Sequence, residues 1–85
     1  MKIRVRYFAA VKERVGRDVE EIDVPADVST VGGLRAWLRE RGGAYEGAFS
    51  ETRLVRSALN QDMVKSTAQI KPGDEVAFFP PVTGG

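Results

Sequence analysis

Cysteine and histidine are both absent from this chain of 85 residues. Their absence excludes disulfides, thiol nucleophiles, imidazole bases and nearly all common zinc or iron–sulfur ligand sets. A strong excess of charge is also missing, because 13 basic and 12 acidic side chains leave a formal net charge of +1. We therefore expect no nucleic-acid partner, no bound metal and very few side chains suited to catalysis.

Long hydrophobic runs are missing as well. The first six residues, MKIRVR, alternate charged and apolar side chains and lack the apolar stretch of roughly 7–15 residues that a signal peptide contains. No segment approaches the roughly 20 apolar residues that span a bilayer. We therefore expect a cytoplasmic protein without a membrane partner. With 42% hydrophobic residues, a chain of this length suits one domain with a modest core.

Strand patterns occur near both ends of the chain. Residues 3–8, 19–24 and 75–79 alternate with the period of two that is typical of strands. Residues 54–59 and 63–67 flank the turn-forming Asn60-Gln61-Asp62 and predict a hairpin. Pro72 and Gly73 suit the central positions of a type II turn before the last strand.

One convincing helix follows Ser29 or Thr30, either of which can cap it, and it ends before Gly42-Gly43. Gly32 and Gly33 in its first turn weaken it by about 1 kcal/mol each, and the sequence does not explain them. Residues 9–15 predict a short helix closed by Gly16 in a left-handed conformation, and residues 44–53 an irregular connection with one further helical turn. This order predicts an α+β fold of the β-grasp, ubiquitin-like type, with one main helix packed across a mixed sheet.

Charged and aromatic side chains on the strands are assigned to faces by the same alternation. Glu20-Glu21 and Asp74-Glu75 are not paired catalytic acids, because adjacent strand residues point to opposite faces, and we interpret both pairs as surface or turn charges. Arg4 and Arg6 are expected on a solvated face, with an acidic partner as the lesser alternative. Phe8 and Phe79 are expected to point outward and form an apolar patch beside the C-terminal tail; the alternative is simple burial at an edge.

The C-terminal residues are the most informative part of the sequence. Pro80-Pro81 ends the last strand, so residues 80–85 are expected to leave the domain, residues 1–79, as a projecting tail with a reach of up to roughly 20 Å. Gly84-Gly85 lacks β-carbons and suits entry into a narrow slot. The terminal carboxylate, once activated by adenylation with ATP and exchanged with sulfide, would become a thiocarboxylate. The alternative is an ordinary frayed end.

Residues 73–85, GDEVAFFPPVTGG, resemble the C-terminal signature of the small subunits of molybdopterin synthase. The resemblance extends over the whole chain, and the tail motif is its most specific part. Its other landmarks are Tyr7-Phe8-Ala9, Val11-Lys12-Glu13 with Val15-Gly16, Thr30-Val31 with Leu34, and Asn60-Gln61.

The resemblance implies a role for the tail and a set of partners. Gly85 would be adenylated by a ubiquitin-activating-type enzyme and thiocarboxylated, and Gly84 would help the tail to thread. The large catalytic subunit would accept the tail and use its sulfur to build molybdopterin from cyclic pyranopterin monophosphate, in a heterotetramer of two small and two large subunits. The chain itself would bind no cofactor and would not be catalytic alone. The implied partner-binding residues are Phe8, Met63, Phe79, Pro80, Pro81, Val82 and Thr83.

Three alternatives remain at the level of the sequence. A related carrier for thiamine or tRNA thiolation would share the fold and the thiocarboxylate. A ubiquitin-like modifier would be attached to target lysines through the same glycine. A free-standing enzyme is the least expected, since no acid–base or nucleophilic set is visible. The pattern around Met63 favours core filler, in contrast to the interface role that the resemblance implies.

Overall fold

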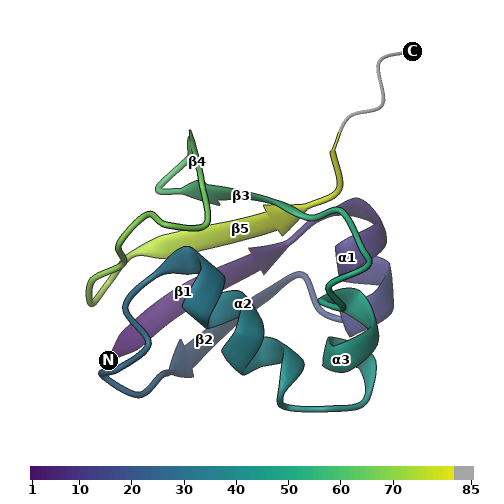
Figure 1. The fold of residues 1–85 in the computed structure, drawn as a ribbon, viewed down its shortest axis with the longest axis horizontal. Coiled ribbons are helices and arrows are strands. Elements are labelled where there is room, and N and C mark those ends of the chain that lie inside the picture. Colours follow the sequence, from purple (N-terminus) through teal and green to yellow (C-terminus); the bar gives the residue numbers. More distant parts are fainter. Residues whose placement is uncertain (82–85) are drawn as a thin grey trace.

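A mixed sheet with strand order β2-β1-β5-β3-β4 organises the chain (Figure 1). We analysed a computed structural model, which describes residues 1–81; the predicted tail residues 82–85 lie outside the described residues. β1 runs parallel to β5 and antiparallel to β2, and β3 lies antiparallel between β5 and β4. The strands in this part of the chain are β1 (Lys2–Tyr7), β2 (Val19–Asp23), β3 (Arg56–Leu59), β4 (Asp62–Val64) and β5 (Glu75–Phe79). The predicted α+β, β-grasp class is confirmed.

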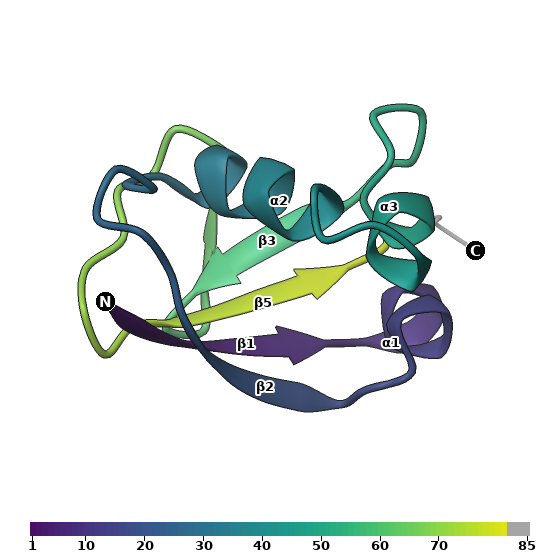
Figure 2. The ribbon, with the colours of Figure 1, turned by 90° about the horizontal axis from the view of Figure 1, so that it is seen from below.

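The helices are α1 (Ala9–Val15), α2 (Val31–Arg39) and α3 (Ala44–Ala48). α2 lies across one face of the sheet, whereas α1 and α3 are grouped at the end where β1 and β5 finish (Figures 1 and 2). Within residues 1–81, none of them is both long and apolar enough to cross a membrane.

Local signals in the sequence explain the helix ends. Gly16 closes α1 with a φ of 81°, as predicted, because a left-handed residue lets its N–H reach back to the helix. Thr30, one of the two predicted caps, accepts a hydrogen bond of 3.0 Å from the Gly33 N–H at the start of α2. The turn before β5 has Gly73 at a φ of 87°, as expected for the third position of a type II turn.

The glycines that open α2 have a steric explanation. A β-carbon at Gly32 would lie 3.1 Å from the carbonyl oxygen of Ser66, and one at Gly33 would lie 3.2 Å from the Thr30 hydroxyl. The Gly32 N–H donates to the same Ser66 oxygen at 2.8 Å. The first turn of α2 therefore sits directly on the segment after β4, and this packing offsets the low helix propensity of glycine.

The second hairpin is shorter than predicted at both outer ends. After β4, the carbonyls of Ser66 and Ala68 accept hydrogen bonds from the first turn of α2, so this backbone cannot continue the ladder. Before β3, the Arg35 guanidinium donates to the carbonyls of Ser50 and Arg53 at 2.8 and 2.9 Å and holds residues 50–53 in a loop. Backbone groups that have found other partners do not pair as strands.

The core lies between the sheet and the helices. Aromatic rings meet at its centre, where the centroids of Phe49 and Phe78 are 5.0 Å apart and those of Tyr7 and Phe49 are 6.1 Å apart. Leu34 and Leu38 of α2 are fully buried above them. Each such side chain contributes roughly 1.5–3 kcal/mol through burial. The opposite face of the sheet carries the alternate residues, and the candidate site lies there.

Candidate functional site

A row of paired residues crosses the sheet on the face opposite the core. Arg6 pairs with Val19 of β2 and with Ala77 of β5, Ala77 pairs with Ala58 of β3, and Ala58 pairs with Met63 of β4. Paired residues project to the same face, so small and apolar side chains run from the middle of this face to β4. Met63 is 65% exposed, which shows that the core-filler interpretation was wrong.

Two aromatic residues extend this row toward the C-terminal end of β5. The N–H of Phe8 donates to the carbonyl of Phe78 at 3.0 Å, which sets Phe8 beside the end of β5. Phe8 is 39% exposed and Phe79 is half-buried, whereas Phe78 is completely buried. The predicted outward orientation of both phenylalanines is confirmed. We call Phe8, Ala58, Met63, Ala77 and Phe79 together the apolar sheet face.

Arginines border the apolar sheet face. The guanidinium of Arg6 lies 5.4 Å from the centre of the Phe8 ring, a cation–π geometry that leaves Arg6 half-buried rather than fully solvated. Arg56 pairs with Phe79 across the β3–β5 ladder. The surface beside the end of β5 is therefore apolar at its centre and cationic at its margin.

The tail root is formed by Pro80 and Pro81, which follow β5 directly and are both half-buried. Neither has an N–H to continue the ladder, so β5 ends at Phe79 as predicted. The four remaining predicted site residues, Val82, Thr83, Gly84 and Gly85, lie outside the described residues. The structure thus brings Phe8, Phe79 and the tail root together, with Met63 farther along the same face.

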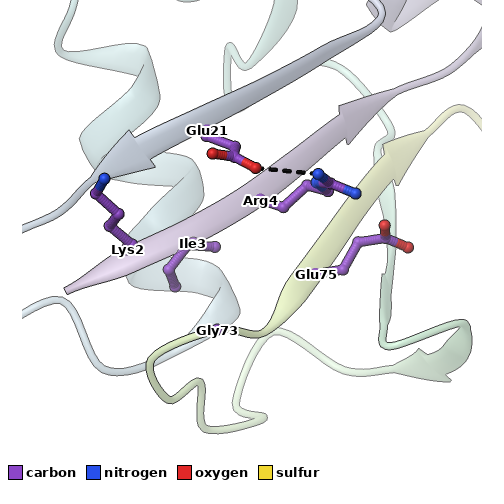
Figure 3. A pocket seen from close by; sticks show the side chains of 6 residues that line it. All are labelled: Lys2, Ile3, Arg4, Glu21, Gly73 and Glu75. Atoms are coloured by element: carbon purple, nitrogen blue, oxygen red, sulfur yellow. Dashed lines mark hydrogen bonds and ion pairs between the residues drawn. The ribbon is translucent and has the colours of Figure 1, made fainter.

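A hollow of about 440 Å³ occupies the other end of this face, where β1 begins (Figure 3). Arg4 crosses it to form a 3.0 Å ion pair with Glu21, and Lys2 and Glu75 also line it. Its charges are of both signs, and none of the residues that line it carries a thiol, hydroxyl or imidazole group. Among residues 1–81, no group of three or more acidic side chains is placed to hold a metal ion.

Glu20 is not the surface charge that the sequence suggested. Its carboxylate accepts hydrogen bonds from the hydroxyls of Tyr7 at 3.0 Å and Tyr45 at 2.8 Å, and from Arg41 at 3.0 Å. Burial raises the pKa of Glu20, but the hydrogen bonds from Tyr45, Tyr7 and Arg41 outweigh burial, so this pKa lies below its ordinary value. Burial raises the pKa of Tyr7 above its ordinary value, and the neighbouring carboxylate adds to the effect.

Asp74 lies in the turn before β5, as one of the two interpretations had it, but it is not a surface charge, since it is only 4% exposed. It accepts hydrogen bonds from the Asn60 amide at 3.0 Å, and from the backbone and the ammonium of Lys71 at 2.9 and 3.1 Å. Burial opposes ionisation, but these donors lower the pKa of Asp74 below its ordinary value. Glu20 and Asp74 tie loops and strands together, and neither lies in the apolar sheet face.

The chain is similar to known proteins over nearly its whole length. The ThiS family profile matches residues 5–85. The molybdopterin synthase sulfur carrier subunit of Escherichia coli K12 is 43% identical over 83 residues, which cover 98% of this chain and 99% of that protein. The protein of the same name from Haemophilus influenzae is 36% identical, with the same coverage.

A solved structure also aligns over the full length of both chains. It is a complex of subunits 1 and 2 of the molybdopterin-converting factor from Helicobacter pylori, and its matching chain has a TM-score of 0.65 at 26% identity. With the family match covering nearly all of the sequence and the curated relatives well above 30% identity, the chain belongs to the ThiS family, and its relatives named above are sulfur carrier subunits of molybdopterin synthase.

Proposed function

We propose that this chain is the sulfur carrier subunit of a molybdopterin synthase and that the C-terminal carboxyl group of Gly85 carries the sulfur. The observation that carries the proposal is the full-length match to sulfur carrier subunits, in a family whose profile extends through residue 85. The sequence itself supports it, because a chain without cysteine or histidine has no side-chain thiol or imidazole to offer.

The chemistry requires activation of the carboxylate. An adenylating enzyme of the ubiquitin-activating type joins the carboxylate to the α-phosphate of ATP and releases pyrophosphate. Sulfide then attacks the acyl carbon, the bond to AMP breaks, and a thiocarboxylate remains. In the large subunit, this sulfur passes to cyclic pyranopterin monophosphate, and water restores the carboxylate. This chain contributes the acyl group and its positioning and no acid–base catalyst.

The apolar sheet face is the proposed docking surface for both enzymes. Phe8 and Phe79 stand beside the tail root, and Met63 extends the same surface to β4. Exposed aromatic and methionine side chains of this kind are typical anchors of interfaces. Pro80 and Pro81 fix the direction in which the chain leaves β5, and Val82, Thr83 and Gly84 carry the reactive end into the partner.

The proposed assembly contains two of these chains and two large subunits and is cytoplasmic. The Helicobacter pylori complex supports the pairing with a second subunit, since one of its chains aligns with the whole of this one.

Removal of Gly85 tests the function. The shortened chain still ends in a glycine carboxylate, but its reactive end is displaced by one residue, about 3.5 Å. We expect an unchanged thermal midpoint, because terminal residues contribute little to stability, and loss of sulfur transfer in an assay with the large subunit. The matched control is Lys65→Arg, a conservative change at an exposed position. Normal transfer by the shortened chain would refute the proposed role of Gly85.

The same reconstitution separates the alternatives. A carrier for thiamine or tRNA thiolation would acquire the thiocarboxylate but would not yield molybdopterin with the large subunit. A protein modifier would instead form isopeptide bonds with lysines of other proteins.

A further inference from the structure

A groove of about 330 Å³ lies beside the tail root, and the roles described above leave it unused. α1, the loop before β3 and the chain after β5 meet at this end of the sheet (Figure 1). Ala10 and Arg14 line it from α1, Arg53, Leu54 and Val55 line it from the loop, and Pro80 forms its border with the tail. A protein that contacts the tail root at Pro80 would therefore lie next to this groove.

Leu54 is the most exposed large hydrophobic side chain among residues 1–81, at 79%. A single exposed leucine is ordinary on a surface, but this one stands on a loop that is held in place. Arg35 donates to the carbonyls on both sides of the loop, and the Ser50 and Thr52 hydroxyls lie 3.0 Å apart. A side chain presented by an ordered loop loses little entropy when a partner covers it.

The charge of the groove has one sign. Arg14 and Arg53 line it, and no acidic side chain of the described residues does. Neither arginine takes part in an ion pair within residues 1–81. Arg53 donates to the Gly47 carbonyl at 2.7 Å, which fixes its position and leaves its charge without a counter-ion in this part of the chain.

We infer that this groove is a second contact site for the large subunit that receives the tail, and that the subunit presents there an apolar side chain flanked by a carboxylate. The apolar part would cover Leu54 and Val55, and the carboxylate would meet Arg14 and Arg53. Pro80 makes the groove continuous with the proposed tail contact. The partner would therefore contact the tail root both at the groove and at the apolar sheet face. The inference rests on the proposed function.

Binding of the full chain to the large subunit tests it. Leu54→Ser is expected to raise the dissociation constant about tenfold. Arg14→Glu is expected to raise it by a similar factor at low salt and by less at high salt, because the contact is electrostatic. Lys65→Glu is the matched control, since it makes the same change in net charge at an exposed position that does not line the groove.

Both groove residues are exposed or lie on an exposed helix surface, so their variants should keep the thermal midpoint of the parent chain. Phe79→Ser reports separately on the apolar sheet face. If Phe79→Ser weakens binding and both groove variants bind like the parent chain, the second contact is refuted and the proposed function stands. If Phe79→Ser and the groove variants all bind like the parent chain, the large subunit does not dock at this end of the sheet. The groove and the apolar sheet face are then both overturned as contact sites, whereas the role of Gly85 is still decided by the sulfur-transfer assay.

Discussion

Replacement of Glu20 by alanine should destabilise the fold through one buried hydroxyl. Glu20 is the acceptor for Tyr7, whose ring is completely buried, and for Tyr45 and Arg41, which lie nearer the surface. A buried donor left without a partner costs about 1–3 kcal/mol. The two outer donors can turn to water, so each loses only the net value of its bond, about 1 kcal/mol. We therefore expect Glu20→Ala to cost about 3–5 kcal/mol.

The loss is measurable by urea unfolding at neutral pH followed by circular dichroism. In a domain of this size, 1 kcal/mol corresponds to a shift of the thermal midpoint of about 4–8 °C, so in a thermal unfolding scan the midpoint of the same variant should fall by roughly 12–40 °C. Tyr7→Phe alone should cost about 1 kcal/mol, since it removes one hydrogen bond and keeps the ring.

The double variant decides whether this reasoning is right. In the Glu20→Ala background the Tyr7 hydroxyl has no acceptor, so Tyr7→Phe should be neutral or stabilising there. If Tyr7→Phe costs the same in both backgrounds, the two residues are not coupled and the argument fails. Because folding lowers the pKa of Glu20, its contribution is present above the ordinary glutamate pKa of about 4.3 and is lost as the pH falls through the folded value. The difference between parent and Glu20→Ala should therefore shrink in acid.

Three further predictions concern other parts of the molecule. Folding also lowers the pKa of Asp74, so the parent chain should lose stability below pH about 4. Asp74→Asn should be less stable than the parent chain by about 2 kcal/mol at neutral pH and should lose less stability in acid. Urea unfolding across pH 2–7 tests this, and equal acid sensitivity of the two chains would contradict it. Gly32→Ala should lower the thermal midpoint because the new β-carbon meets Ser66. Gly47→Ala has open space around the new β-carbon and should raise the midpoint, because alanine has the higher helix propensity. A rise in both variants would show that helix propensity outweighs packing. Phe79→Ser should raise the dissociation constant for the large subunit at least tenfold in a titration, and an unchanged value would remove Phe79 from the interface.

The sequence predicts the sheet and the main helix well because their signals are local. Period-two alternation placed Tyr7 inward and Phe8 outward, and the structure agrees. The ends of β3 and β4 could not be predicted, because they are decided by contacts with distant residues, the Arg35 guanidinium and the first turn of α2.

The burial of Glu20 and of Asp74 could have been predicted from the sequence. Glu20 is two residues from the buried Ile22, and Asp74 is two residues from the buried Val76, so the alternation already directs both side chains inward. Their acidic character suggested the surface instead, since unpaired charges are rarely buried. The donors that make burial favourable come from far along the chain, such as Arg41 for Glu20, and no local pattern reveals them.

The apolar sheet face could be predicted in part. Alternation gave the orientation of Phe8 and Phe79, whereas the position of Met63 on the same face depends on the pairing of β4 with β3. The groove around Leu54 could not be foreseen, since it requires α1, the loop and the tail root to meet.

The central claim is that the reactive group is the backbone carboxyl of the last residue. Its most direct test is the intact mass of the chain after incubation with the adenylating enzyme, ATP and a sulfide source. We expect a gain of about 16 Da, the exchange of one oxygen for sulfur, located in the C-terminal fragment. An unchanged mass under conditions in which the enzyme activates its own carrier, or a gain located elsewhere in the chain, would contradict the account.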